Sequence, residues 1–207
     1  MANASTKYRI AINGYGRIGQ CVLRALVERQ HPELEVVAIN ELSDLATITY
    51  LTRYDTTHGR FPGEVDNDGS ALLVNGQRIH VLCERDPQAL PWGELDIDLV
   101  LECSGSFKDR ATAEQHLTAG AKRLLFSQPA ENDVDATIVW GINEHELTPT
   151  QRILSAASCT TNCLVPLLTV LYTMASAIPA FQGMEQNIQE LLFEHLVPET
   201  SAGLEEY

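Results

Sequence analysis

A cysteine at position 159 is the residue with the clearest chemical potential in this sequence. It lies between a strand-like segment, residues 152–157, and an apolar stretch, residues 164–172, which is predicted to be helical. The sulfur of Cys159 is therefore expected at the start of a helix, where free backbone amides and the helix dipole favour a thiolate over a thiol. A thiolate placed there is a candidate covalent nucleophile, provided that a base or a cation assists it.

A glycine-rich motif near the N-terminus predicts a nucleotide site. Gly14, Gly16 and Gly19 fit the G-x-G-x-x-G pattern between a predicted strand and a predicted helix. In such motifs the first glycine permits a tight turn, the second lets a pyrophosphate approach the backbone, and the third lets the helix pack closely. Glu41 ends the next predicted strand about 20 residues later, where a carboxylate binds the ribose hydroxyls and repels a 2′-phosphate. The pattern predicts NAD as cofactor; a ligand-free turn is the alternative.

Strand-like and helix-like segments alternate over the first 160 residues. Strands are predicted at 8–13, 35–39, 98–103, 122–127, 136–140 and 153–156, helices at 17–30, 109–119 and after Ser43-Asp44, and a hairpin at Asn75-Gly76. The alternation is typical of the α/β class, a Rossmann-type, mainly parallel sheet with helices on both faces. We expect an NAD-binding Rossmann domain over 1–158, a nucleophile helix over 159–173, and an acidic tail over 174–207 with a short amphipathic helix at 184–196.

Composition narrows the class of partner. The chain has 207 residues and a formal net charge of −14, which disfavours nucleic acid and anionic membrane as partners. We find no signal peptide and no transmembrane span, and therefore expect a cytoplasmic protein with free thiols. Cys159 and Cys163 lack further ligands nearby, so no metal site is predicted. The apolar segments around Cys21, Cys83 and Cys103 predict that these three are core residues.

Four motifs together resemble the phosphorylated-aldehyde dehydrogenases, the family of glyceraldehyde-3-phosphate and erythrose-4-phosphate dehydrogenases. They are residues 13–19, 38–42 (Ala-Ile-Asn-Glu-Leu), 54–61 (Tyr-Asp-Thr-Thr-His-Gly-Arg-Phe) and 158–163, and they occur in the family's order. The resemblance covers about residues 7–173. Within the family, segments 38–42 and 132–141 look closer to the erythrose-4-phosphate enzyme.

The resemblance implies an activity, a mechanism and further site residues. The implied reaction oxidises erythrose 4-phosphate to erythronate 4-phosphate with NAD, as in pyridoxine biosynthesis, and the family is typically tetrameric. Cys159 would attack the aldehyde, hydride would pass from the hemithioacetal to NAD, and water would release the acid. Inorganic phosphate would give an acyl phosphate in the glyceraldehyde enzyme. By the same similarity, Arg17 and Ile18 would lie over the pyrophosphate, Ser104 and Gly105 would line the cofactor site, and Ser127 would lie near the nicotinamide.

Two departures from the family pattern limit the expected activity. Ala156 stands where the family usually has Asn, a residue that supports the nucleophile loop. After about residue 173 the resemblance stops, so the chain is expected to be truncated before the catalytic domain. Gln186 stands where the family has its general-base histidine, and no Lys or Arg follows Arg152 to bind substrate phosphates. A general base contributes about 10²–10⁴ in rate, so we expect NAD binding without significant turnover.

Three alternatives stay open at this point. The first is a fragment of a glyceraldehyde-3-phosphate dehydrogenase. The second is a non-catalytic NAD-binding or interaction module whose tail recruits a partner, and the third is the product of a frameshifted or interrupted gene.

Overall fold

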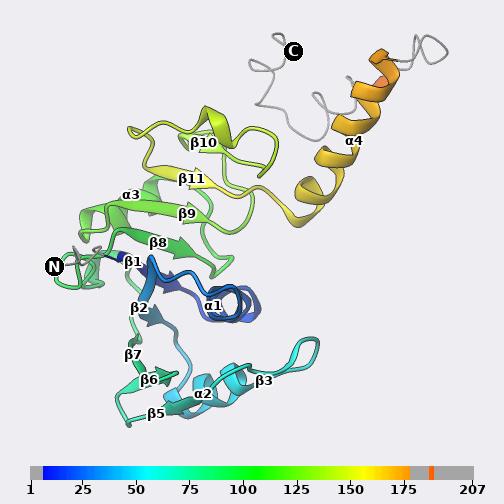
Figure 1. Cartoon of the computed structure of the whole chain (residues 1–207). Coiled ribbons are helices and arrows are strands. Elements are labelled where there is room, and N and C mark those ends of the chain that lie inside the picture. The colour runs from blue at the N-terminus through cyan, green and yellow to red at the C-terminus, as the bar shows by residue number, and fades with distance from the viewer. Residues whose placement is uncertain (1–6, 178–186, 189–207) are drawn as a thin grey trace, which may run out of the picture. The chain divides into compact units, whose positions relative to one another are not determined.

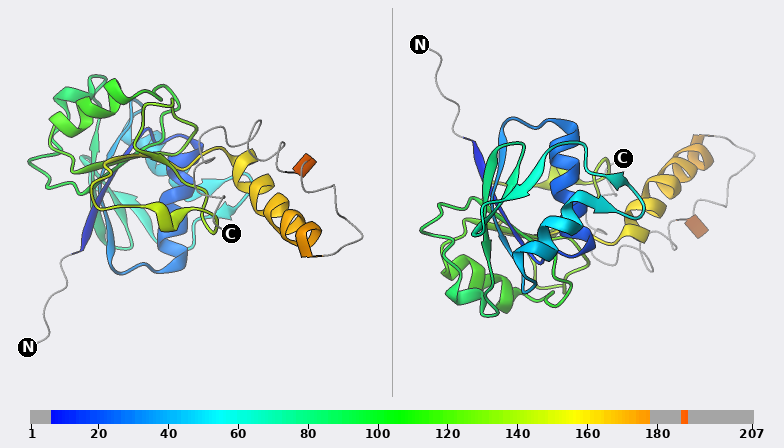
Figure 2. Two further views of the ribbon diagram at one scale, coloured as in Figure 1. Left: turned by 90° about the horizontal axis from the view of Figure 1, so that it is seen from above. Right: turned by 90° about the horizontal axis from the view of Figure 1, so that it is seen from below.

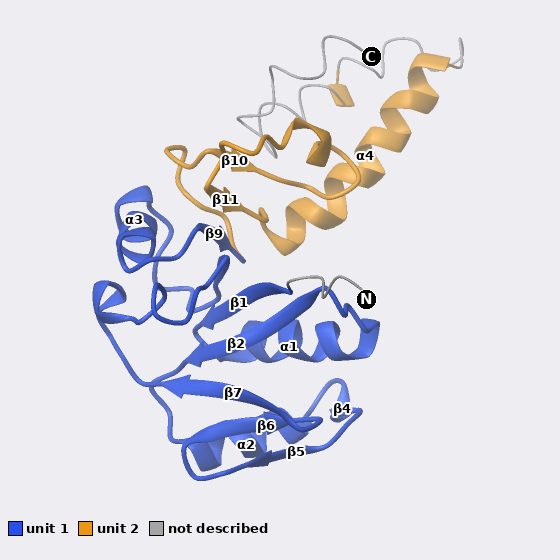
Figure 3. Cartoon of the chain, turned by 60° about the vertical axis from the view of Figure 1, so that its left-hand side comes forward, with its two compact units in different colours: residues 1–127 blue, residues 128–207 orange. Residues whose placement is uncertain are grey.

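The computed structural model describes residues 7–177 and 187–188. The chain divides into two compact units, residues 1–127 and residues 128–207, which are coloured separately in Figure 3. We describe each unit by itself. Most of the predicted tail helix, together with Gln186, lies outside the described residues. The predicted domain limits at 158 and 173 stay predictions.

The first unit is built on a sheet whose strands run in the order β9-β8-β1-β2-β7-β6-β5 (Figure 1). These strands are β1 (Tyr8–Asn13), β2 (Leu34–Asn40), β5 (Val65–Asn67), β6 (Ala71–Val74), β7 (Gln77–Leu82), β8 (Leu99–Glu102) and β9 (Arg123–Phe126). The pairs from β9 to β7 are parallel, and β6 and β5 add antiparallel pairs. In this register Asn13 lies beside both Asn40 and Glu102, so three polar residues meet at the carboxyl ends of β1, β2 and β8.

Helices cover both faces of this sheet, as predicted. They are α1 (Arg17–Arg29), α2 (Leu45–Arg53) and α3 (Arg110–Thr118), with a short 3₁₀ turn at Pro87–Ala89. The crossover from β1 through α1 to β2 and the crossover from β8 through α3 to β9 run in opposite directions along the sheet. Right-handed crossovers then place α1 and α3 on opposite faces, as Figure 2 shows. Asp44 and Asp109 cap α2 and α3 by accepting hydrogen bonds from Thr47 N and Thr112 N.

Three short strands and one cysteine differ from the sequence-based expectation. No sequence pattern predicts β5 or the small hairpin formed by β3 (Tyr54–Asp55) and β4 (Gly59–Arg60). Cys103 is buried, as predicted for a core residue, and burial raises the pKa of its thiol to about 11. The same prediction is wrong for Cys83, which is exposed just after β7, and Cys21 is only half-buried. Apolar neighbours in the sequence are not enough to predict burial here, because Cys83 lies just beyond the last paired residue of its strand.

Asp98 should make the stability of this unit depend on pH. It accepts hydrogen bonds from Arg9 N at 2.8 Å and Lys122 Nζ at 2.7 Å. Burial raises the pKa of Asp98, but these bonds outweigh burial and leave that pKa below its usual value. A carboxylate with a lowered folded-state pKa stabilises the fold above its unfolded pKa of about 3.9 and loses that contribution as the pH falls below it. As the pH is lowered from 5, we therefore expect the unfolding free energy to fall less in the D98N variant than in the wild type. Urea unfolding at each pH measures this difference.

The exposed Asp96, which also pairs with Lys122, at 3.0 Å, provides the control for this prediction. The D96N variant should keep the pH dependence of the wild type. Equal pH dependence in D98N and wild type would contradict the assignment.

In its described residues, the second unit contains a parallel strand pair and one long helix. The pair is β10 (Ala136–Thr137) and β11 (Ile153–Ser155), and a 3₁₀ turn, η2, covers Glu144–Glu146. Both strands are shorter than predicted. The helix α4 (Cys159–Ala177) begins at the cysteine, as predicted. Its buried side packs Val165 against Val139 and Ala157, with the half-buried Ile188 against the same cluster.

The outer side of α4 is apolar. Exposed residues on it are Leu164, Leu167, Val170, Leu171 and Met174. Within the described residues, α4 is the one helix long and apolar enough to cross a membrane by length and composition alone. A single helix of this kind is weak evidence for a span, because helices of soluble proteins pass the same test. The predicted absence of a membrane span stays a prediction.

Candidate functional site

A pocket of about 360 Å³ lies where the carboxyl ends of β1, β2 and β8 meet. Residues from four separate loops and strand ends line it: Asn13, Gly14, Gly16, Asn40, Glu41, Leu42, Glu84, Arg85, Pro87, Leu90, Cys103, Ser104, Ser106 and Phe107. Open parallel sheets bind ligands at this edge, beside the strands from which the crossovers diverge. The pocket therefore has the location expected for a nucleotide site.

The glycine-rich turn forms one wall of this pocket. Gly14 has φ +86°, and a Cβ there would overlap the backbone of Ser104, so no other residue fits without a shift. A Cβ on Gly19 would overlap the carbonyl oxygen of Gly14, which explains the close approach of α1 to β1. A Cβ on Gly16 would meet no atom within 4 Å, and no side chain caps α1 at this position. The turn thus leaves room, and uncapped amides, for an anionic group.

Glu41 fixes the turn to the end of β2. Its Oε2 accepts a hydrogen bond from Tyr15 N at 2.8 Å, and its Oε1 accepts one from Leu42 N at 2.8 Å. The half-buried carboxylate lines the same pocket as Gly14 and Gly16. The structure places Gly14, Gly16 and Glu41 on one pocket, and their contact with a cofactor stays a prediction.

The other predicted cofactor residues lie around the pocket in different ways. Ser104 lines it, next to Gly14. Arg17, Ile18 and Gly105 are exposed and do not belong to the lining, and Arg17 instead donates to Asp55 Oδ2 at 3.1 Å. Ser127 follows β9, where its backbone N donates to the carbonyl of Glu102 at 3.0 Å.

A buried polar network, which the sequence did not reveal, supports the pocket from below. Glu102 is fully buried and accepts hydrogen bonds from Asn13 Nδ2 and Ser104 N. Asn13 Oδ1 in turn accepts from Asn40 Nδ2, at 2.7 Å, and Asn40 Oδ1 accepts from Glu84 N. One carboxylate therefore joins the strand that precedes the glycine-rich turn to the loop that carries Ser104.

Two aromatic side chains extend this network behind the sheet. Trp92 Nε1 donates to His116 Nδ1 at 3.0 Å, which places the proton of a neutral His116 on Nε2. His116 Nε2 lies 3.5 Å from Glu102 Oε2, and within the described part of the chain it is the buried side-chain atom without a hydrogen bond. Trp92, His116 and Glu102 are all fully buried.

Cys159 is the first residue of α4, as predicted, and it is exposed. The turn before it is tightly held. Ser158 Oγ accepts a hydrogen bond from Thr161 N at 2.9 Å, and Asn162 Nδ2 donates to the carbonyls of Ala156 and Ser158 at 2.8 and 2.9 Å. Asn162 therefore holds the backbone carbonyl of Ala156, a contact that does not depend on the side chain at position 156. Cys163 is also exposed.

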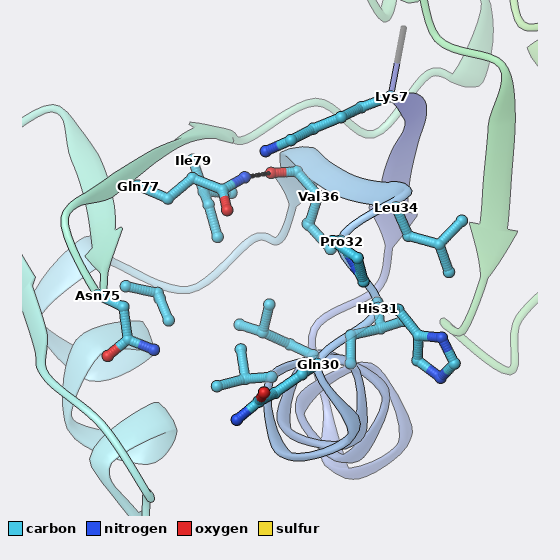
Figure 4. Close-up of a pocket in the computed structure, with 13 residues that line it drawn as sticks. Lys7, Gln30, His31, Pro32, Leu34, Val36, Asn75, Gln77 and Ile79 are labelled. Carbon is cyan, nitrogen blue, oxygen red and sulfur yellow. Dashed lines mark hydrogen bonds between the residues drawn. The ribbon is translucent and has the colours of Figure 1, made fainter. Parts of the chain in front are cut away.

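A second pocket, of about 380 Å³, lies at the amino ends of β1 and β2 (Figure 4). Its walls are mostly aliphatic, and Lys7, Gln30 and His31 lie at its border. Gln77 Nε2 bridges to the carbonyl of Val36 at 2.9 Å beside it. This pocket has neither a glycine-rich turn nor convergent carboxylates.

Comparison with known proteins is consistent with a nucleotide site in the first pocket. Residues 8–110 match the family described as the NAD binding domain of glyceraldehyde 3-phosphate dehydrogenase. Two proteins of Cupriavidus necator, the plasmid and the chromosomal glyceraldehyde-3-phosphate dehydrogenase, are each 55% identical to this chain over 166 residues. Each match covers 79% of this chain and 49% of the relative. The chain thus spans about half the length of the curated relatives it matches.

Proposed function

We propose that this chain serves the NAD-dependent oxidation of a phosphorylated aldehyde, a proposal supported by the match of residues 8–110 to the NAD binding domain of glyceraldehyde 3-phosphate dehydrogenase. The observation that carries the proposal is the convergence of Gly14, Gly16, Glu41 and Ser104 on one pocket at the carboxyl ends of parallel strands. Cys159 at the start of α4 supplies the second element, an exposed sulfur on a firmly held turn.

In the proposed cofactor site each residue has a distinct task. The uncapped first turn of α1 binds the pyrophosphate beside Gly16, with Arg17 and Ile18 over it. The Glu41 carboxylate accepts hydrogen bonds from the ribose hydroxyls. Ser104 lines the site, the exposed Gly105 follows it at the rim, and Ser127 would lie near the nicotinamide. Bound NAD would supply the hydride acceptor for the reaction.

The charge of Glu41 should set the preference for NAD over NADP. In the E41Q variant the amide oxygen still accepts the hydrogen bond from Tyr15 N, while the negative charge that repels a 2′-phosphate is lost. We expect the ratio of the NADP to the NAD dissociation constant to fall by about tenfold, or about 1.4 kcal/mol. Calorimetric titration of both nucleotides measures it. The exposed Glu64, which does not line the pocket, provides the control E64Q, and an equal ratio in both variants would contradict the role.

The proposed chemistry begins at the sulfur of Cys159. The thiolate forms a bond to the aldehyde carbon, and the carbonyl oxygen takes up a proton to give a hemithioacetal. Loss of a hydride from that carbon, together with loss of the hydroxyl proton to solvent, would then leave a thioester on Cys159. Water would cleave the thioester to the free acid, and inorganic phosphate would cleave it to an acyl phosphate.

Erythrose 4-phosphate is the substrate that we propose, on the resemblance of segments 38–42 and 132–141. The two relatives named above carry the name of glyceraldehyde-3-phosphate dehydrogenase, so glyceraldehyde 3-phosphate is the competing candidate. The family's tetramer is a further expectation for the whole assembly.

This chain alone is expected to bind NAD without sustained turnover, because the residues expected to act as base and to bind the substrate phosphate are not found in its sequence. The test mixes the purified chain with NAD and erythrose 4-phosphate, or with NAD, phosphate and glyceraldehyde 3-phosphate, and records NADH formation. We expect no sustained formation with either aldehyde. Sustained formation that disappears in the C159S variant would contradict the expected inactivity and would identify the preferred aldehyde.

A further inference from the structure

Three potential metal ligands gather between α1 and the β3–β4 hairpin, outside the cofactor pocket. They are Cys21, Asp55 and His58, whose ligand atoms (the sulfur, a carboxylate oxygen and a ring nitrogen) all lie within 4.8 Å of one another. Thiolate, imidazole and carboxylate are the ligands that Zn²⁺ binds in proteins. We propose that these three side chains bind a Zn²⁺ ion, with water in the fourth position.

Asp55 is held in place by its own loop. Its Oδ1 accepts hydrogen bonds from His58 N at 2.7 Å and Thr57 N at 2.8 Å. These two bonds fix the carboxylate oxygen on its loop, so it needs no rearrangement to meet a cation.

The imidazole lies beside the same carboxylate. His58 Nδ1 lies 3.0 Å from Asp55 Oδ1, close to the separation of about 3.3 Å expected between two ligand atoms that are each about 2.0–2.1 Å from a tetrahedral Zn²⁺ ion. A histidine binds a metal through a ring nitrogen that carries no proton. The ion would therefore replace the contact between Nδ1 and Asp55, and Nε2 would carry the ring proton.

Arg24 holds the backbone of the loop from the side of α1. It is 8% exposed and donates to the carbonyls of His58 at 3.0 Å, Gly59 at 3.0 Å and Arg60 at 2.6 Å. The hairpin is thus fixed against the helix that carries Cys21, so the three ligands do not depend on a loop rearrangement to approach one another.

Two guanidinium groups lie beside the cluster, and one of them is paired with a carboxylate outside it. Arg24 pairs with Glu28 at 2.9 Å, whereas Arg17 pairs with Asp55 Oδ2 at 3.1 Å and would turn away from this carboxylate when the ion binds. The Arg17 side chain is exposed, so solvent can take up its charge. Half-burial of Cys21 and Asp55 limits screening by solvent, while the exposed His58 leaves a path for entry.

The test titrates the full chain with Co²⁺ in the absence of NAD. The sulfur-to-cobalt charge-transfer absorption reports whether a thiolate binds the ion. Zn²⁺ is then added to displace Co²⁺, which gives the Zn²⁺ affinity. We expect one equivalent of Co²⁺ and loss of the charge-transfer band in C21S. The H58Q and D55N variants should weaken Zn²⁺ binding by at least about tenfold. Because NAD is absent, failure of this test leaves the proposed cofactor site untouched.

Matched variants distinguish metal binding at this site from nonspecific metal binding to the acidic surface or to the other exposed thiols. His31 is also exposed and pairs with a carboxylate, Glu33, at 3.0 Å. The H31Q, C83S and C159S variants should therefore keep both the band and the Zn²⁺ affinity. The proposal is overturned if no band forms, if the band persists in C21S, or if H58Q binds Zn²⁺ like the wild type. Thermal unfolding of metal-free C21S shows whether this variant is folded. If it is not, the Zn²⁺ affinity of H58Q, which changes an exposed side chain, tests the proposal instead.

Discussion

The E102A variant is expected to lose about 1–3 kcal/mol of unfolding free energy, the usual cost of leaving a buried hydrogen-bonding group without its partner. Glu102 is fully buried and accepts hydrogen bonds from Asn13 Nδ2 and Ser104 N, with His116 Nε2 at 3.5 Å. Its truncation would leave these donors buried without an acceptor and open a cavity beneath the pocket. Chemical denaturation followed by circular dichroism measures the loss.

Two further variants make this prediction specific. The E102Q variant keeps one acceptor oxygen and should lose less stability than E102A. Glu64 is exposed, and its truncation in E64A should cost no more than about 0.5 kcal/mol. If E102A were as stable as E64A, the network would not support the pocket as we describe.

The G14A variant is expected to weaken NAD binding by at least about 100-fold, which corresponds to about 2.8 kcal/mol. Gly14 has φ +86°, and an added Cβ would overlap the backbone of Ser104 across the pocket wall. Both walls of the cofactor pocket would have to move apart. Calorimetric or fluorescence titration with NAD measures the change.

Gly69 is the matched control, since it has the same φ of +86° but open space around its Cβ. The G69A variant shares the backbone strain, about 1–2 kcal/mol, without changing the pocket, and should bind NAD like the wild type. Equal loss of affinity in both variants would attribute the effect to strain rather than to the pocket wall.

The elements that position the cofactor were predictable because they depend on local patterns. Runs of apolar residues fixed β1 and β2, glycine spacing fixed the turn between β1 and α1, and Glu41 follows from its place at the end of β2. The hairpin at Asn75-Gly76 was predictable for the same reason, since both residues adopt positive φ values of 50° and 79°.

The supporting network was not predictable because its partners are distant in sequence. Asn13 and Glu102 are 89 residues apart, and Trp92 and His116 are 24 apart. Glu102 ends an apolar strand, where its carboxylate gives no sign of burial until the neighbouring strands are placed beside it. The zinc ligands are equally scattered, since Cys21 lies in α1 whereas Asp55 and His58 lie on a hairpin that the sequence did not indicate.

Calorimetric titration of the full chain with NAD tests the central claim most directly. We predict one NAD bound per chain, binding that is retained in C159S and lost in G14A. A folded chain that releases no heat with NAD, together with no NAD-dependent rise in its unfolding temperature, would contradict the assignment of the pocket at the ends of β1, β2 and β8 as the cofactor site.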